Sequence, residues 1–372
     1  MNIAIVIPNL RRGGAERVVT RLAAHWAGRH EVTMILFERA IEYECNARII
    51  SLDLPASRGP LAKILNIPRR AWKLRSLLRE LRPDRTIAFL ESANMPAVLG
   101  GWPVTVTVRN DPRVLFHPLE RKLQGWLYRR SNVRRVVCNS LRMAEAMQIE
   151  YKLQRADVIY NPVDPLELEG LARADTPDVP GPYIVAAGRL TAQKNFPLLI
   201  RAFARSRAAR KYRLVILGDG AERTALEALA RKEGVAERLH LPGAVNNPFA
   251  YFRGAECFVL SSNHEGFPNV LLEALACGTP ALASDCDFGP VEVITPGVNG
   301  HLFQPGDEDA LVALLDRAAR EDDFFEKLRP GCLPSLKPFR LEQVAPRWLE
   351  DPEDSMQVER AGVNASESEV GA

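Results

Sequence analysis

Residues 261–280 read SSNHEGFPNVLLEALACGTP, and they follow the short apolar run Cys257–Leu260. An apolar run of this length is typical of a buried strand. The polar residues after it predict a loop, and Pro268 suits the first position of a helix. A second apolar run, Pro280–Ser284, predicts the next strand. Strand, loop, helix and strand in this order indicate a parallel sheet with helices on its faces.

The same alternation runs through the whole chain in two blocks. The first block predicts strands at Asn2–Pro8, Glu31–Phe37, Thr86–Leu90, Val104–Val108 and Arg135–Cys138. The second block predicts strands at Tyr183–Ala187, Arg213–Leu217, Leu239–Pro242, Cys257–Leu260 and Pro280–Ser284. We therefore expect an α/β protein with two Rossmann-like, doubly wound domains that face a central cleft.

A stretch rich in proline and acidic residues, residues 161–182, separates the two blocks. It predicts a first domain at residues 1–165, a linker at 166–182 and a second domain at 183–335. Residues 336–350 are expected to form a helix that returns to the first domain. The acidic, serine-rich residues 351–372 are expected to be a disordered tail.

Composition narrows the class of protein. The six cysteines show no metal-ligand spacing, no signal peptide is recognised, and no apolar run reaches the roughly 20 residues of a membrane helix. These features predict a cytoplasmic protein with reduced thiols. Residues 1–175 hold 28 basic and 18 acidic residues, whereas residues 176–372 hold 21 and 28. The basic first half predicts an anionic partner or surface.

The predicted helix after Pro268 offers an anion site. The first amides of a helix lack partners within it, and the helix dipole adds positive potential there, so Asn269 and Val270 are expected to meet a phosphate. Glu273 lies about one turn further on, within reach of ribose hydroxyls. Glu265 precedes the helix, where it can meet sugar hydroxyls. The alternative is an ordinary proline cap with two solvated glutamates.

A second group of residues follows the predicted strand Tyr183–Ala187. Arg189 and Lys194 come at its carboxyl end, where open parallel sheets bind ligands. Arginine grips phosphate oxygens in a bidentate manner and lysine acts as a point charge. The pair could neutralise a departing nucleoside diphosphate. Taken alone, they could equally be exposed surface cations.

Together these motifs resemble the family-4 retaining glycosyltransferases with the GT-B fold, of the surface-polysaccharide and lipid-linked-oligosaccharide type. The segment EGFPNVLLE is similar to their signature of two glutamates, and GRLTAQKN to their pair of phosphate-binding cations. LGDGAER, the N-terminal GGAER, and YNPVD before the linker also match. The resemblance covers roughly residues 1–350.

The resemblance implies a role for each matching residue. Arg189, Lys194 and Glu265 would form the catalytic group, with the two cations on the donor diphosphate and Glu265 on the sugar. Glu273 would bind the ribose. The remaining donor-binding positions would be Gly13, Gly14, Gly218, Asn246, Pro248, Phe267, Asn269 and Val270. The first domain would lie on the acceptor side, and the second would hold the nucleotide-sugar. Members of the family transfer sugar with retention and without an obligatory metal or other cofactor.

Two segments depart from the family pattern. Where many relatives carry a histidine after the strand Val104–Val108, this chain has Arg109 and Asn110, which become candidates for the first-domain role. The Gly-Gly often found after Pro280–Ser284 is replaced by residues 285–290, DCDFGP, a variant that favours UDP over GDP. Asp285 and Asp287 also form a D-x-D pattern that can bind a divalent cation, but no metal site is expected here.

Two basic, amphipathic segments, Leu61–Arg82 and Arg113–Arg135, bear on the acceptor. Such helices either lie on anionic lipid or bury their apolar stripe in the sheet, and the sequence leaves both open. Nucleic-acid binding is not expected, because no nucleic-acid-binding motif accompanies the charge. We expect a protein that sits peripherally on the inner face of the membrane.

The predicted activity is therefore that of a retaining hexosyltransferase. It would move a hexose or N-acetylhexosamine from a nucleotide-diphosphate sugar, with UDP favoured, to a hydroxyl of a lipid-linked or polysaccharide acceptor. The main alternative is a sugar-nucleotide epimerase on the same scaffold, which would need no acceptor. A dehydrogenase is disfavoured because GGAER lacks the G-x-G-x-x-G spacing. A non-catalytic binder is disfavoured because Arg189, Lys194, Glu265 and Glu273 are all present.

Overall fold

The structure is a computed structural model that describes residues 1–11, 13–55, 60–111, 113 and 117–351; for residues 60–65 it describes the backbone alone. Contacts divide the chain into two compact units. The first unit comprises residues 1–139, 143–162 and 341–351, and the second comprises residues 140–142 and 163–340. Within the described part of the chain, no helix is both long and apolar enough to cross a membrane.

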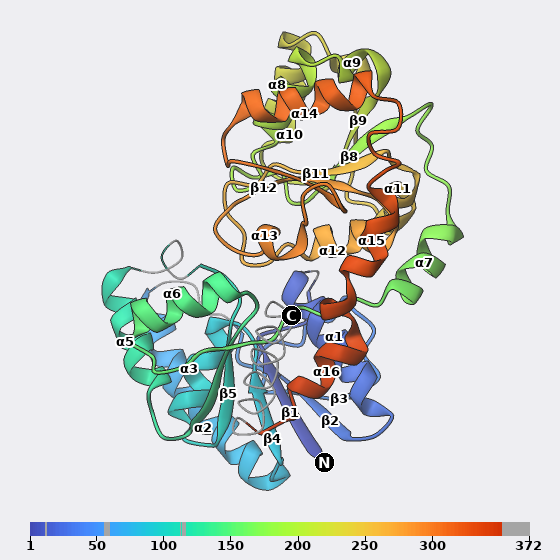
Figure 1. Cartoon of the computed structure of the whole chain (residues 1–372). Helices are drawn as coiled ribbons and strands as arrows, with labels where there is room; N and C mark the ends of the chain where they lie inside the picture. The colour runs from blue at the N-terminus through green and yellow to red at the C-terminus, as the bar shows by residue number, and fades with distance from the viewer. Residues whose placement is uncertain (12, 56–59, 112, 114–116, 352–372) are drawn as a thin grey trace, which may run out of the picture. The chain divides into compact units, whose positions relative to one another are not determined.

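The first unit is built on a seven-stranded parallel sheet of order β3-β2-β1-β4-β5-β6-β7. Its strands are β1 (Asn2–Ile7), β2 (Glu31–Leu36), β3 (Arg48–Ser51), β4 (Arg85–Ala88), β5 (Val104–Val108), β6 (Val133–Cys138) and β7 (Asp157–Val158). Its helices are α1 (Gly14–Ala27), α2 (Pro60–Leu81), α3 (Glu91–Leu99), α5 (Pro118–Tyr128), α6 (Leu141–Tyr151) and α16 (Leu341–Arg347). Helices α1 and α16 cover one face of the sheet, and α2, α3, α5 and α6 cover the other (Figure 1).

The second unit repeats the plan with a six-stranded parallel sheet of order β10-β9-β8-β11-β12-β13. Its strands are β8 (Tyr183–Ala187), β9 (Arg213–Leu217), β10 (Leu239–Gly243), β11 (Cys257–Leu260), β12 (Ala281–Ser284) and β13 (Gly300–Phe303). On one face lie α8 (Phe196–Arg205), α9 (Ala208–Lys211), α10 (Arg223–Lys232) and α14 (Glu308–Arg320) (Figure 1). On the other lie α11 (Pro248–Gly254), α12 (Asn269–Ala276), α13 (Pro290–Val293) and α15 (Arg329–Ser335). Short 3₁₀ turns occur at Ala236–Arg238 and Lys337–Phe339.

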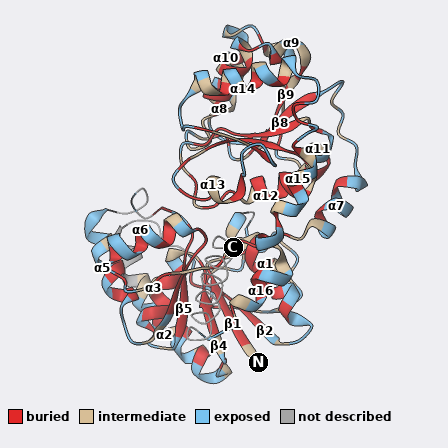
Figure 2. Cartoon of the chain, in the orientation of Figure 1, coloured by how far each residue is buried: buried red, intermediate tan, exposed pale blue. Residues whose placement is uncertain are grey.

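The prediction of two doubly wound parallel α/β domains is confirmed. In each sheet the strand order reverses beside the first strand, between β1 and β4 and between β8 and β11. The central strands are buried throughout, as expected for parallel strands covered on both faces (Figure 2). The sequence did not indicate β3, β7 or β13. These strands lie at sheet edges and are only two to four residues long, so they carry little apolar pattern.

The predicted linker contains a helix, α7 (Pro165–Ala174), which packs against α11 and α12. Asp164 caps it by accepting hydrogen bonds from the amides of Leu166 and Glu167, and Pro165 occupies the first turn. Leu168 and Ala172 are its buried side chains. Most of α7 thus lies within the segment expected to be the linker.

The carboxyl-terminal segment returns to the first unit through α16, which packs on α1. The helix expected at residues 336–350 is interrupted, because Arg340 is extended between the 3₁₀ turn and α16. Trp348 is buried, with its ring centroid 5.3 Å from that of Phe89. The predicted tail at residues 352–372 lies outside the described residues.

The cations of α2 are largely structural. Arg70 is buried, donates hydrogen bonds from Nε and Nη2 to the Leu54 carbonyl and lies 4.6 Å from the centroid of the Phe37 ring. Lys73 donates to the Leu52 carbonyl and Arg75 to the Gly100 carbonyl. Of the two readings of Leu61–Arg82, the described part of α2 therefore matches a helix packed on its sheet.

We expect Trp348→Ala to lower the free energy of unfolding of the first unit by about 3–5 kcal/mol, because it leaves a large cavity beside Phe89. Urea unfolding followed by circular dichroism measures this change. Trp72→Ala is the matched control, since Trp72 is 70% exposed. It should change the free energy by less than about 0.5 kcal/mol. Equal losses in the two variants would contradict the packing of α16 described here.

Candidate functional site

Glycines bring two loops together at the carboxyl ends of β8 and β9. The Gly188 amide donates to the Leu217 carbonyl and the Leu190 amide to the Asp219 carbonyl, both at 2.9 Å. Gly218 has a φ of +133°, and a Cβ there would lie 2.0 Å from the Gly188 oxygen. Only glycine permits this approach. Gly218, predicted as a donor-site residue, therefore has a defined structural role in shaping the loop that carries Arg189.

A second set of hydrogen bonds joins the loop after β8 to the loop after β11. The Ser261 hydroxyl donates to the Lys194 carbonyl at 2.8 Å, and the Asn263 amide donates to the Gln193 carbonyl at 2.8 Å. The Gln193 side chain donates to the His264 carbonyl at 3.0 Å. Since β8 and β11 are neighbours at the point where strand order reverses, this is the edge where open α/β sheets bind ligands.

Lys194 and Glu265 form an ion pair at the centre of these loops. Lys194 Nζ lies 2.6 Å from Glu265 Oε1, and the Ser262 hydroxyl donates to the same oxygen at 2.6 Å. The side chains of Lys194 and Glu265 are only 15% and 7% exposed. The sequence predicted both residues for the site but assigned them to different parts of a ligand. The structure places them in direct contact.

Arg189 adds a second positive charge on the same loop. Its side chain is exposed, and it makes no ion pair with any residue that the structure describes. Lys194 is largely neutralised by Glu265, so Arg189 is the cation whose charge is available to an incoming anion. A planar guanidinium suits bidentate contact with phosphate oxygens.

The helix predicted after Pro268 is present as α12, but its first turn differs from the prediction. Pro268 is the N-cap, and the Asn269 amide donates to the Phe267 carbonyl at 3.0 Å. The expectation of a free amide at Asn269 is therefore wrong. For Val270, no hydrogen bond from the amide is found within the described residues. The anion site at this terminus thus rests on Val270 and the helix dipole.

Glu273 and Phe267 are both buried. Glu273 is 4% exposed in α12, and the Cys277 thiol one turn further has its pKa raised to about 12, first by burial and then by the charge of Glu273. Phe267 packs its ring 5.9 Å from that of Phe339. Its side chain therefore belongs to the packing of the second unit, which the sequence did not anticipate.

Asn246 and Pro248, two of the predicted donor-binding positions, lie at the start of α11. Asn246 is exposed, and Pro248 occupies the first turn of the helix. Asn247, which was not predicted as a key residue, donates from its amide group to the Leu171 carbonyl and to Asp175, both at 2.7 Å. The turn is thus held to α7, the helix that the sequence did not predict.

In the first unit, Gly13 and Gly14 begin α1 after the carboxyl end of β1. The Glu16 carboxylate lies close to Gly13. A Cβ added to Gly13 would be only 2.2 Å from Glu16 Oε2. Burial raises the pKa of Glu16, while a hydrogen bond from its own backbone lowers it. The turn combines small residues with a helix N-terminus, as the glycine motif predicted.

Arg109 and Asn110 differ sharply in environment. Asn110 is exposed, but Arg109 is buried, with its guanidinium carbon 4.8 and 5.3 Å from the ring centroids of Phe89 and Trp348. It donates to Asn161 Oδ1. Burial lowers the pKa of Arg109 to about 9. Arg109 therefore packs within the first unit, and of the two first-domain candidates only Asn110 presents its side chain to solvent.

The residues of the D-x-D pattern differ in burial. Asp285 is half-buried, Cys286 is buried and Asp287 is exposed. Among the residues that the structure describes, no three histidine, cysteine or acidic side chains are grouped so as to hold a metal ion.

The sequence missed the polar residues that support the site. Ser262, Ser261 and Gln193 fix Lys194 and Glu265 through the contacts described above. Ser284, at the end of β12, donates to the Ser262 carbonyl at 2.7 Å. The available signal was the position of Ser261 and Ser262 immediately after β11, which identifies this sheet edge but no particular partner.

Two family models match the chain, one in each half. The model described as Glycosyltransferase Family 4 matches residues 12–166, and the model described as Glycosyl transferases group 1 matches residues 173–330. A relative from Campylobacter jejuni subsp. jejuni serotype O:2 is 31% identical over 361 residues, covering 92% of this chain and 97% of the relative. Its name is N-acetylgalactosamine-N,N'-diacetylbacillosaminyl-diphospho-undecaprenol 4-alpha-N-acetylgalactosaminyltransferase.

Solved structures share the fold at lower identity. HepE of Anabaena in complex with UDP and glucose has a TM-score of 0.76 at 18% identity, covering 93% of this chain and 98% of that one. The lipopolysaccharide outer core galactosyltransferase WaaB in its apo form has a TM-score of 0.66 at 22% identity, covering 91% of this chain and 98% of that one.

We expect Lys194→Met to destabilise the second unit by about 3 kcal/mol, because it leaves the Glu265 carboxylate buried without its cation. Urea unfolding of Lys194→Met, Glu265→Gln and the double variant measures the coupling between the two residues. Arg189→Met is the matched control and should change the free energy by less than about 0.5 kcal/mol. Additive effects of the two substitutions would contradict the ion pair.

Proposed function

The chain belongs to glycosyltransferase family 4, whose solved relatives have the GT-B fold, and on this premise we propose that it is a retaining hexosyltransferase using a UDP-sugar. The acceptor is a hydroxyl of a lipid-linked or polysaccharide glycan. The observation that carries the proposal is the contact of Glu265 with Lys194 and Ser262, with Arg189 on the same loop as Lys194 and in no ion pair with a described residue.

The site supplies the charges that this reaction needs. When the bond between sugar and diphosphate breaks, negative charge grows on the leaving phosphate. Arg189 and Lys194 are the cations positioned to stabilise it. Glu265 accepts hydrogen bonds from hydroxyls of the donor sugar and orients its ring, and Glu273 binds the ribose hydroxyls. Front-face attack with help from the departing phosphate then needs no enzymatic nucleophile.

The Lys194–Glu265 ion pair would hold Lys194 in position before the donor binds. In the absence of donor, the two charges satisfy each other and hold the loops in place. A bound diphosphate would share Lys194 with Glu265, so the loops need little rearrangement on binding. A preorganised cation stabilises the leaving group more effectively than one that must first be ordered.

The comparisons support the choice of donor and acceptor without assigning them. HepE was solved with UDP and glucose, which supports a uracil nucleotide, as does the DCDFGP variant at residues 285–290. The name of the Campylobacter relative describes transfer of N-acetylgalactosamine to a glycan on diphospho-undecaprenol. This supports an N-acetylhexosamine donor and a lipid-linked acceptor. We include in the proposal that no metal ion is required.

The proposed reaction is tested by incubating the protein with labelled UDP- and GDP-sugars and a membrane extract as acceptor. We expect transfer from a UDP-sugar, with the anomeric configuration retained and with full activity in EDTA. Arg189→Ala should lower kcat/KM at least about tenfold, since a charge-assisted contact to the leaving group is lost. Conversion of a UDP-sugar without acceptor would indicate the epimerase instead. Loss of activity in EDTA would contradict the metal-free mechanism.

The acceptor proposal extends to a membrane surface on the cytoplasmic side. Helix α5 packs Gln124, Gly125, Leu127 and Tyr128 inward. Its opposite face exposes an apolar stripe of Leu119, Leu123 and Trp126, which are 72%, 49% and 53% exposed. Lys122 and Arg130 flank this α5 stripe, and Arg130 lies 5.3 Å from the centroid of the Trp126 ring. Apolar side chains bordered by cations suit the interface of an anionic bilayer.

We expect Leu119→Ser/Leu123→Ser to reduce binding to vesicles of equimolar phosphatidylcholine and phosphatidylglycerol by about tenfold or more, because burial of two leucines is lost. Sedimentation with the vesicles measures this. Leu166→Ser/Leu171→Ser is the matched control, since these leucines are also exposed but lie in α7. Equal binding by both double variants would remove α5 from the proposed membrane contact.

A further inference from the structure

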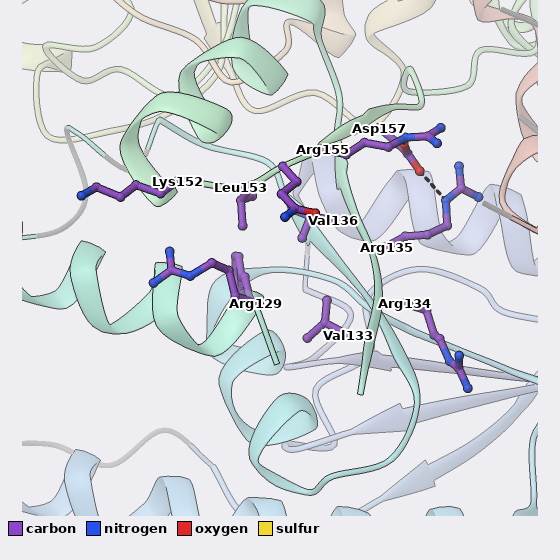
Figure 3. Close-up of a pocket in the computed structure, with 11 residues that line it drawn as sticks. Arg129, Val133, Arg134, Arg135, Val136, Lys152, Leu153, Arg155 and Asp157 are labelled. Atoms are coloured by element: carbon purple, nitrogen blue, oxygen red, sulfur yellow. Dashed lines mark hydrogen bonds and ion pairs between the residues drawn. The ribbon is translucent and has the colours of Figure 1, made fainter. Parts of the chain in front are cut away.

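The first unit contains a pocket of about 430 Å³ that none of the predicted site residues lines. It lies between the end of α5, the start of β6 and the loop from α6 to β7 (Figure 3). Val133 and Asp157 are the first residues of β6 and β7. The pocket is therefore at the amino ends of these strands, whereas Gly13 and Gly14 follow the carboxyl end of β1. Its volume is in the range of small-molecule sites.

The lining of the pocket is strongly basic. Its basic residues are Arg129, Arg134, Arg135, Lys152 and Arg155, and its one acidic residue is Asp157. Asp157 is shared, because Arg135 Nε lies 2.7 Å from one of its carboxylate oxygens and Arg155 Nε lies 2.5 Å from the other. One carboxylate neutralises only part of this charge, so the pocket carries a net positive potential.

Some cations of the pocket donate hydrogen bonds to backbone carbonyls, and others form no ion pair with a described residue. Arg135 is buried and also donates to the carbonyls of Arg347 and Glu350. Arg129 donates to the Tyr151 carbonyl. Arg134 and Lys152, in contrast, are exposed, and neither forms an ion pair with any described residue. These two residues are available to an anion at opposite rims of the pocket, since their side chains extend to opposite sides (Figure 3).

The floor of the pocket is apolar. Val133, Val136 and Leu153 lie between the charged side chains, with Arg129 and Lys152 reaching to one side and Arg134, Arg135 and Arg155 to the other (Figure 3). An apolar floor between cationic walls suits a ligand that carries an anionic group on a less polar body. Phosphate esters have this character, and arginine and lysine are their usual partners.

We propose that this pocket, named here the β6–β7 pocket, binds the phosphate group of an ester ligand at a site separate from the donor site. Of the two sources, a phospholipid headgroup is favoured over a free phosphate ester. The pocket takes Tyr128 and Arg129 from the end of α5, and only Leu127 separates them in sequence from Trp126 of the exposed α5 stripe. Phosphate recognition in the pocket does not depend on the reaction proposed above.

The test compares Arg134→Gln/Lys152→Gln with wild type and with Arg29→Gln/Arg48→Gln. The control removes the same charge from exposed positions of the same unit that do not line the pocket. The probes are inorganic phosphate, followed by calorimetry, and vesicles of equimolar phosphatidylcholine and phosphatidylglycerol, followed by sedimentation. Loss of charged contacts should weaken binding of at least one probe about tenfold in the pocket variant, with the control unchanged.

The pattern of losses identifies the source. Weaker binding of the vesicles, with or without weaker binding of phosphate, supports a lipid headgroup. Weaker binding of phosphate alone supports a free phosphate ester. Equal binding of both probes by the two double variants, or no binding of either probe by wild type, overturns the proposal. Because all four residues are exposed, thermal unfolding of both variants should match wild type. Leu119→Ser/Leu123→Ser should retain phosphate binding, which separates this site from the α5 stripe.

Discussion

The ion pair between Lys194 and Glu265 is the contact on which the organisation of the second unit's site depends. It joins the loops that follow β8 and β11, the strands between which the strand order reverses. Both side chains are largely buried, so each would be costly to keep charged without the other. The surrounding hydrogen bonds from Ser262, Ser261 and Gln193 follow from the need to satisfy and orient this pair. Arg189 remains outside the pair, which leaves one cation for a ligand.

Sequence reasoning located this edge of the sheet because buried parallel strands appear as apolar runs in the sequence. The carboxyl ends of parallel strands then lie at the same edge of the sheet. Sequence reasoning proposed Arg189, Lys194, Glu265 and Glu273 as site residues from residue type and position. It could not predict that Lys194 contacts Glu265, because the residues are 71 positions apart and the contact depends on how two loops close. The same limit explains Asn269, whose amide bonds to Phe267 in a local turn that no helix rule anticipates.

The basic residues of the first half of the chain show a second limit of prediction from sequence. A count of basic residues predicts a cationic surface, yet Arg70, Arg75 and Arg135 donate to backbone carbonyls. Arginine can satisfy several carbonyls through one planar group, so it suits the ends of loops and strands that lack backbone partners. Arg109 is buried against two aromatic rings. Much of the basic excess therefore stabilises the fold, and only the cations left without such partners are available for binding.

Four exposed cations of the first unit belong to α5 and the segments that follow it. Lys122 and Arg130 border the exposed stripe of α5, and Arg134 and Lys152 border the β6–β7 pocket just beyond the end of that helix. These positions belong to the part of the first sheet farthest along its strand order from β1 and the glycine turn of α1. A surface built this way can hold an anionic or amphipathic partner through α5 and β6 while the loop after β1 stays unoccupied. The α5 stripe and the β6–β7 pocket share no side chain with the glycine turn after β1. Substitutions in the stripe or the pocket therefore need not alter binding at that turn.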